Sequence, residues 1–322
     1  MLSFLRSRVF GKSKSPSQGV LAIAATGGGF AAAVTQLQAP DSNRLLHGTV
    51  HPSGQGEQAR RLKALVEQMH WSGRRCRWVL NVSDFRILNA FAPEVAAHEM
   101  REALRWRIQD MIDFPVDDAE IEFFPMPASR QAGREQALSV LACRRATLRA
   151  YTELCEEAGL VLDAIDVPQL CLRNLTRLLP ESQRGVAVLQ LAETSSVLQL
   201  QKDAVIYITR EMEIGSVHLH QALTSENAEA VNQVIERLAL EIQRSLDYYE
   251  SHYGMPPVAG LVVAPIPECT QRLVDGLNQS LGVIARAMDV GALLDCDERL
   301  DDATQQLCLS AIGSALQREL AA

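Results

Sequence analysis

Gly27, Gly28 and Gly29 are consecutive glycines between two apolar runs that together extend over residues 19–37. Because glycine lacks a Cβ atom, its backbone N–H groups can approach a phosphate closely. A nucleotide site also needs carboxylate oxygens to hold magnesium, yet the first 40 residues contain no acidic side chain. The glycines therefore predict either an anion-binding turn or an ordinary β-hairpin turn, and the hairpin turn is the simpler interpretation.

A second candidate site is the H-x-H pair of His218 and His220, with Glu211 and Glu213 nearby in the sequence. If the pair lay on a strand, its two imidazoles could be metal ligands. No third ligand is spaced to complete such a site, so the sequence does not favour a metal centre.

The composition restricts the class of protein. The chain has 322 residues, enough for two lobes with separate cores, and 47% hydrophobic residues, which is ordinary for a globular protein. A net charge of −8 argues against a nucleic-acid binder, and the isolated tryptophans Trp71, Trp78 and Trp106 form no stacking platform. Seven scattered cysteines, without a C-x-x-C pair, predict buried thiols in a reducing compartment.

Hydrophobic periodicity predicts strands that alternate with helices in both halves, which indicates an α/β protein. The expected helices are residues 58–70, 93–112, 147–158, 169–179, 229–249, 269–281 and 304–320. The expected strands are a hairpin over residues 20–37 and single strands at 77–82, 121–124, 137–143, 161–167, 186–191, 196–201, 205–209 and 260–264. A strand–turn–strand unit near residue 20 and another near residue 186 form a weak internal repeat, as expected of a duplicated, two-lobed fold.

The first 18 residues alternate apolar side chains with Arg6, Arg8, Lys12 and Lys14. This pattern predicts either a disordered tail or a segment that lies on an anionic membrane surface. A signal peptide is the alternative, but three glycines interrupt its apolar region. No segment has the roughly 20 unbroken apolar residues of a spanning helix.

Four passages, taken in order, resemble one known family. Residues 104–126 resemble its helix, phenylalanine-proline break and strand, and residues 141–175 resemble its next strand, helix and strand. Residues 208–215 and 241–249 complete the pattern. From residue 19 to residue 320 the chain resembles the PilM-like members of the actin-like ATPase superfamily. Within them the nearer resemblance is to the MshI proteins of mannose-sensitive haemagglutinin (MSHA) pilus biogenesis.

The resemblance implies a two-lobed actin-like (ribonuclease H-like) fold with a small subdomain inserted in the first lobe. The implied parts are a tail at 1–18, a first lobe at 19–83 and 161–184, an insert at 84–160, a second lobe at 185–300 and a helix at 301–322 that returns to the first lobe. Residues 180–185 would then be the hinge. The carboxylates Asp163 and Asp166 could form a catalytic pair, but the resemblance places them on a structural strand.

Three loops that hold ATP and magnesium in this superfamily have different residues here. Ala24 and Ala25 stand where an Asp is expected, residues 190–192 replace Asp-x-Gly, and residues 264–266 replace a glycine run. Without the carboxylates magnesium loses its anchor, and phosphoryl transfer depends on that metal. The resemblance therefore implies a pseudo-ATPase without a cofactor. Glu241 and Arg244, on the helix that faces adenosine in relatives, are either residual nucleotide contacts or a solvated helix face.

The resemblance further implies a cytoplasmic adaptor of type IV pilus assembly at the inner face of the inner membrane. Its partner would be the N-terminal tail of a PilN-like membrane protein, docked in a groove of the first lobe, with further links to the assembly ATPase. Trp106, Phe114 and Pro115 are candidates for a wall of that groove, although a buried helix stop is the simpler interpretation of Phe114 and Pro115.

Two alternatives remain. One is an active PilM-like ATPase with substituted ligands. The other is a GspL-like cytoplasmic component of type II secretion, which is disfavoured because such chains continue into a membrane span whereas this sequence ends at Ala322.

Overall fold

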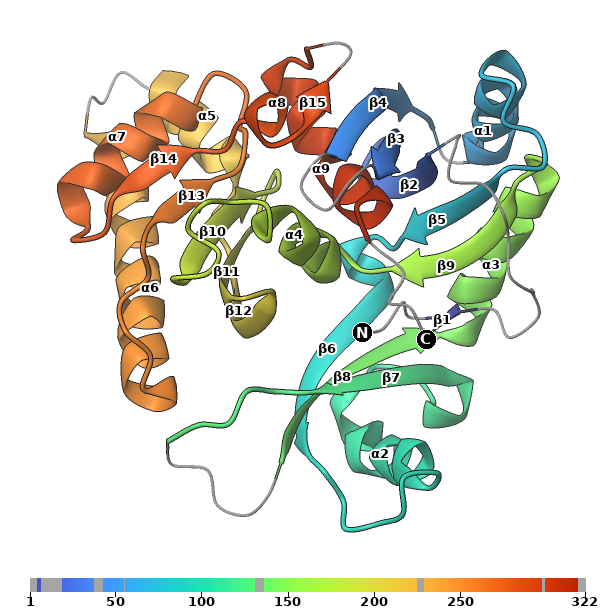
Figure 1. Cartoon of the computed structure of the whole chain (residues 1–322), viewed down its shortest axis with the longest axis horizontal. Coiled ribbons are helices and arrows are strands. Elements are labelled where there is room, and N and C mark those ends of the chain that lie inside the picture. The colour runs from blue at the N-terminus through green and yellow to red at the C-terminus, as the bar shows by residue number, and fades with distance from the viewer. Residues whose placement is uncertain are drawn as a thin grey trace.

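The structure is a computed structural model, and it describes residues 5–6, 19–37, 43–54, 56–130, 136–224, 229–296 and 299–317. These residues form three sheets: two large ones that lie side by side and a small one below the first (Figure 1). The expected membrane-binding or disordered tail lies outside the described residues, except for the two-residue strand β1 (Leu5–Arg6), which pairs with β9.

The first large sheet has the order β1-β9-β5-β2-β3-β4-β15. Its strands after β1 are β9 (Val161–Asp166), β5 (Arg75–Val79), β2 (Val20–Thr26), β3 (Gly29–Leu37), β4 (Asn43–Pro52) and β15 (Asp295–Cys296). The hairpin expected at residues 20–37 is confirmed: β2 and β3 pair antiparallel from Val20↔Thr35 to Thr26↔Gly29.

The apolar run of β3 is continuous because both faces of this sheet are buried. Phe30 and Val34 point into a core made with α1 (Gln58–Gln68) and α3 (Arg145–Glu157). The intervening alanines, Ala31 and Ala33, point to the opposite face, toward α4 (Pro168–Thr176) and α9 (Asp302–Ala315). Small side chains allow α9 to approach this face closely, and Thr35 Oγ1 donates a hydrogen bond to the Ala315 carbonyl at 2.8 Å.

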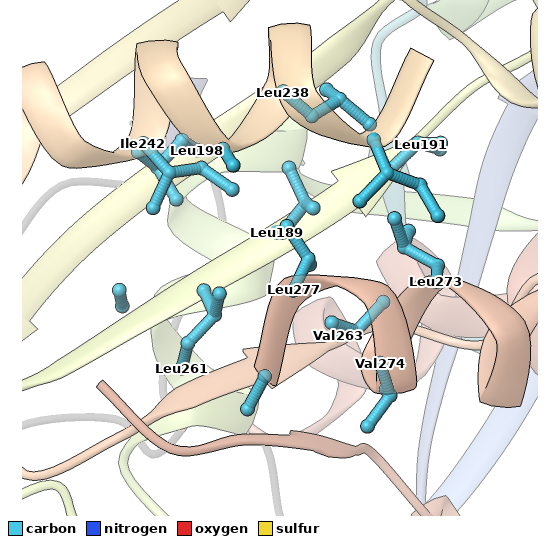
Figure 2. Packing of buried hydrophobic residues seen from close by; sticks show 14 of the residues in the cluster. Leu189, Leu191, Leu198, Leu238, Ile242, Leu261, Val263, Leu273, Val274 and Leu277 are labelled. Carbon is cyan, nitrogen blue, oxygen red and sulfur yellow. The ribbon is translucent and has the colours of Figure 1, made fainter. Parts of the chain in front are cut away.

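The second large sheet has the order β12-β11-β10-β13-β14. Its strands are β12 (Val205–Met212), β11 (Ser196–Lys202), β10 (Val186–Leu191), β13 (Leu261–Val263) and β14 (Ala285–Ala287). One face packs against α6 (Ala230–Tyr253) and α7 (Thr270–Ser280), and Figure 2 shows their leucines meeting those of the sheet. On the other face, Val186 and Val188 belong to the cluster that contains α4 and α9. Both large sheets therefore share the core around α4 and α9.

The small sheet has the order β6-β8-β7 and lies below the first large sheet (Figure 1). Its strands are β6 (Phe85–Phe91), β8 (Ala137–Arg144) and β7 (Ala119–Pro125). The helix α2 (Met100–Ile108) packs against it. Short 3-10 turns lie at Val82–Asp84, Gln109–Met111 and Val116–Asp118.

Several predicted elements needed correction. The helix expected at residues 93–112 begins only at Met100, and the strand expected at 77–82 ends at Val79. Strand β6 was not predicted. Helix α5 (Ser216–Thr224) contains both histidines of the H-x-H pair, which we had considered as strand residues. The last helix ends at Ala315 rather than at residue 320. A short helix, α8 (Val290–Leu293), completes the set.

The segment between α4 and β10, where a hinge was expected, is held by an ion pair. Glu181 accepts two hydrogen bonds, both of 2.8 Å, from the guanidinium of Arg286 on β14. The pair holds the connection to the second sheet, and the hydrogen bonds from Arg286 lower the pKa of the Glu181 carboxyl. The domain boundaries proposed above stay a prediction.

Candidate functional site

The fold itself requires glycine at only one position of the β2–β3 turn. Gly29 has a φ of 149°, and a Cβ atom there would lie 2.1 Å from the His51 carbonyl oxygen of β4. Gly27 and Gly28 are exposed at the tip, where an added Cβ would meet no atom within 4 Å. The Gly28 carbonyl accepts a hydrogen bond from the Ser53 N–H at 2.8 Å. Close packing of β4 thus explains Gly29 without an anion, whereas packing does not explain the two glycines at the tip.

The position expected for a magnesium-binding Asp is apolar in the structure. Ala24 is 2% exposed and belongs to the core shared by the two large sheets. Ala25 packs against the opposite core, with α1 and α3. No carboxylate can therefore be supplied from these two positions.

The loop after β10 uses its backbone groups within the protein. The Ala192 N–H donates to the Ser195 carbonyl at 2.8 Å. The Ala192 carbonyl accepts from the Ser216 N–H at 2.8 Å, at the beginning of α5. A phosphate-binding loop needs free N–H groups, and the N–H of Ala192 is already paired.

The loop after β13 is buried and borders an acidic cavity. Ala264 and Ile266 are 1% and 0% exposed, and the Ala264 N–H donates to the Leu189 carbonyl at 2.8 Å. Pro265 lines a cavity of about 700 Å³ at the beginnings of α7 and α9. Charged side chains around this cavity are Glu268, Asp289, Asp301, Asp302 and Arg299. Four carboxylates and one guanidinium give this cavity a net negative charge, which disfavours a nucleotide triphosphate without its metal ion.

Glu241 and Arg244 lie together on α6, as their spacing requires. Glu241 Oε1 accepts from Arg244 Nη1 at 2.6 Å, and its Oε2 accepts from Arg210 Nη1 of β12 at 3.2 Å. The three side chains tie α6 to the edge of the second sheet. Glu241 and Arg244 thus lie beside the second large sheet, whereas Gly27, Gly28 and Gly29 lie in the hairpin of the first large sheet.

The candidates for the partner-binding wall lie on the small subdomain but do not form one surface. Trp106 on α2 is 61% exposed. Phe114 is 9% exposed, packs in the core of the small sheet, and is covered by the Arg144 guanidinium 4.3 Å from its ring centroid. Pro115 is exposed beside it. Phe114 is thus a buried helix stop, and the role of these residues in partner binding stays a prediction.

The other candidate chemistry has structural roles. On α5 the two imidazoles do not face one site: His218 Nδ1 accepts from the Gly215 N–H at 3.0 Å, and His220 Nδ1 lies 2.8 Å from the Ser216 carbonyl. Groups of His, Cys, Asp and Glu that could hold a metal are absent from the described residues.

Asp163 and Asp166 each pair with an arginine of β5. Asp163 pairs with Arg75, and Asp166 Oδ2 accepts from Arg77 Nε at 3.1 Å. Six of the seven cysteines are buried as expected. Burial raises the pKa of Cys308 to about 12, so this thiol is not a nucleophile at neutral pH.

The structure contains a groove that the sequence did not predict. It has a volume of about 580 Å³ and lies between the small sheet and the second large sheet. Strands β6 and β8 line one side, and β12 and the end of α6 line the other, with Gln169 and Leu170 of α4 also in the lining. The sequence features that could have pointed to this groove are the tyrosines Tyr248 and Tyr253 near the end of α6, which line it.

None of the described helices is both long and apolar enough to cross a membrane. Trp106, Phe114 and Pro115 are not among the residues that line the groove.

Comparisons with known proteins agree with this architecture. The family model of type IV pilus assembly protein PilM matches residues 87–233, which include most of the groove's lining residues. No curated protein sequence matches the chain.

Among solved structures, a PilM–PilN type IV pilus biogenesis complex is 20% identical, with a TM-score of 0.71 over 92% of this chain and 98% of that chain. A Bacteroides thetaiotaomicron protein with actin-like ATPase fold and unknown function is 11% identical, with a TM-score of 0.50 over 88% and 97% of the two chains. The cytoplasmic domain of EpsL, an inner-membrane component of the Vibrio cholerae type II secretion system, is 13% identical, with a TM-score of 0.47 over 93% and 96%. The chain therefore has the actin-like fold, and its residues 87–233 match the PilM family model.

Proposed function

We propose that this chain is a non-catalytic cytoplasmic adaptor of type IV pilus assembly, of the MSHA type, at the inner face of the inner membrane. It would bind the N-terminal tail of a PilN-like membrane protein and would neither bind nor hydrolyse ATP. The MSHA assignment is supported by the sequence resemblance to MshI proteins, and the link to pilus assembly by the PilM family match over residues 87–233.

The observation that most supports a lost nucleotide site is the burial of Ala24 at the end of β2. Magnesium needs an oxygen ligand at this place, and the side chain there is a methyl group, 2% exposed among apolar neighbours. The paired N–H of Ala192 and the acidic lining beside Pro265 also support the loss of the nucleotide site. We infer from these three loops that the groups on which phosphoryl transfer depends are lost here.

Calorimetric titration with ATP and magnesium tests the nucleotide part of the proposal. We expect a dissociation constant weaker than about 1 mM, roughly −4 kcal/mol. Micromolar, magnesium-dependent binding would contradict it and would favour an active ATPase. Binding of a partner peptide by the same preparation is the control that the protein is folded.

The groove is the site we assign to the partner. Grooves recognise extended peptides through backbone hydrogen bonds and pockets for alternate side chains, and this one has the outer strand β12 along one side. The titrant is a synthetic peptide of the N-terminal tail of the PilN-like protein from the same genome. We expect micromolar binding that does not depend on ATP, while a peptide of scrambled sequence should not bind. Equal binding of both peptides would contradict a specific adaptor role.

A further inference from the structure

The groove runs between a strand edge of the second large sheet and one face of the small sheet, which alternate residues of β6 (Ile87, Asn89) and β8 (Ser139, Leu141) line. In the described part of the chain, β12 is the outermost strand of the second large sheet and β6 is an outer strand of the small sheet. The groove is lined on the β12 side by six consecutive residues, Ile206 to Glu211. Consecutive residues of a strand point to opposite faces of its sheet. A groove that all six line must therefore run along the edge of β12 rather than across one face.

The backbone groups on that edge have no partner in the described part of the chain. In an antiparallel pair, alternate residues direct their N–H and C=O groups toward the neighbouring strand, here β11, and the others direct them outward. Apart from the pairs with β11, no hydrogen bond from a described residue reaches the backbone of residues 206–211. The outward groups of β12 are thus available to a ligand.

The outer edges of β6 and β12 differ in how well they are protected against the addition of another strand. Natural proteins protect exposed strand edges with charged side chains, proline or bulges. The carbonyl groups at both ends of β6 are covered by guanidinium groups: Arg86 Nη1 donates to Phe85 at 3.0 Å, and Arg107 Nη1 donates to Phe91 at 3.1 Å. The middle of β12, in contrast, has the sequence Ile-Tyr-Ile-Thr, without charge or proline. The edge of β12 is the open one.

Charges in the groove are largely neutralised within the protein, so the groove suits an uncharged, apolar segment. Arg86 pairs with Asp113 at 3.1 Å, and Arg210 pairs with Glu241 at 3.2 Å. Glu211 is the remaining charged residue among those that line the groove. The aromatic side is made by tyrosines: the ring centroids of Tyr207 and Tyr253 are 5.2 Å apart.

One buried amide in the lining lacks a hydrogen-bond partner. Gln169 is 5% exposed, and its Oε1 makes no hydrogen bond within the described residues. Its backbone carbonyl accepts from Gln199 Nε2 at 3.1 Å, which fixes the residue against β11. Leaving such a group unsatisfied costs roughly as much as a lost hydrogen bond. The amide oxygen can therefore accept a hydrogen bond from an N–H or O–H group of a ligand.

We propose that the ligand of this groove is an extended peptide that pairs with β12 and becomes the sixth strand of the second large sheet. Its backbone would satisfy the outward groups of β12, alternate apolar side chains would lie against the tyrosines, and a neutral polar side chain would reach Gln169. This inference rests on the proposed function for the identity of the peptide, and it is independent of the nucleotide site.

Hydrogen–deuterium exchange with the PilN-like N-terminal peptide tests the pairing. Calorimetry first establishes binding of the unmodified peptide to the whole chain; no binding would overturn both the adaptor proposal and this inference. With binding established, we expect slower exchange in residues 205–212, because the outward N–H groups become hydrogen-bonded. Protection confined to β6, or none in either strand, would overturn the inference and leave the adaptor proposal standing.

Peptides methylated on one backbone nitrogen at a time provide a second measurement, which does not depend on the folding of a variant. Removal of one paired N–H should weaken binding about tenfold at every second position and leave the intervening positions near the unmodified value. Equal loss at all positions, or at none, would contradict strand pairing.

Variants of the protein complete the test. Thr209→Lys places a charge at an exposed position in the middle of β12, the natural device against strand addition, and should weaken binding about tenfold or more. The matched control is Val205→Lys at the beginning of β12, which is 45% exposed and lies outside the groove lining. Equal affinities of the two variants would contradict the proposal. Gln169→Leu should weaken the unmodified peptide but not a peptide whose polar side chain is replaced by an apolar one.

Discussion

The ion pair between Asp166 and Arg77 gives the sharpest test of how the shared core is held. Their side chains are 2% and 9% exposed. Asp166 also accepts a hydrogen bond from Ser314 on α9, and Arg77 also donates to Gln317 just beyond that helix. Asp166→Asn would keep the shape of the side chain but leave the guanidinium buried without a counter-charge. Breaking a buried pair in this way costs about 3–5 kcal/mol, a large part of a typical net stability of roughly 5–15 kcal/mol.

Chemical unfolding in urea, followed by circular dichroism, measures this loss. With a slope near 3 kcal/mol per molar, the upper end for small proteins, the midpoint should fall by about 1–1.7 M. The matched control is Asp163→Asn on the same strand, whose partner is also an arginine of β5. That pair is much more exposed, 25% and 36%, so its loss should cost at most about 1 kcal/mol. Equal shifts for the two variants would refute the role assigned to burial.

Three further outcomes are expected. Glu181→Gln should remove an acid-dependent loss of stability. The pKa of Glu181 is lowered in the folded state, so its stabilisation is present above the unfolded pKa of about 4.3 and is lost as the pH falls through the folded pKa. Melting temperatures of the variant between pH 3 and 6 should therefore depend less on pH than those of the parent. Gly254→Ala should lower the free energy of unfolding by about 1–2 kcal/mol, because φ is 66°, while the Arg130 guanidinium that the new Cβ would meet can move aside. Gly56→Ala, with φ of 79° and open space, should cost about the same in the same unfolding measurement. Trp106→Ser should change the free energy of unfolding by less than about 0.5 kcal/mol, since the ring is 61% exposed, and a loss of partner binding without a loss of stability would support the predicted wall.

Local patterns predicted most of the elements, because burial of both faces makes strands such as β2 and β3 continuous apolar runs. Strand β6 escaped prediction because only Phe85 among its residues is buried, so its sequence shows no clear alternation. Helix α5 was not predicted, because the H-x-H spacing also suits a strand. In the helix, the side chains of His218 and His220 contact local backbone groups.

The groove could not be predicted from periodicity. Its two sides come from β6 and β12, strands of different sheets that are more than 100 residues apart in the chain. Only the packing of the sheets brings them together, and no local pattern reports where the edge of one sheet meets the face of another. The residues proposed from the sequence as a partner-binding wall lie elsewhere on the small subdomain.

The burial of Ala24 limits the substitutions that this position accepts. A single substitution to Asp at this position would put a carboxylate among apolar side chains of both large sheets. An unpaired carboxylate in such surroundings costs several kcal/mol or remains protonated. The variant would therefore lose stability before it gained a metal ligand, and the other two loops would still lack theirs. A core packed in this way therefore opposes the gain of a magnesium ligand at residue 24 by a single substitution.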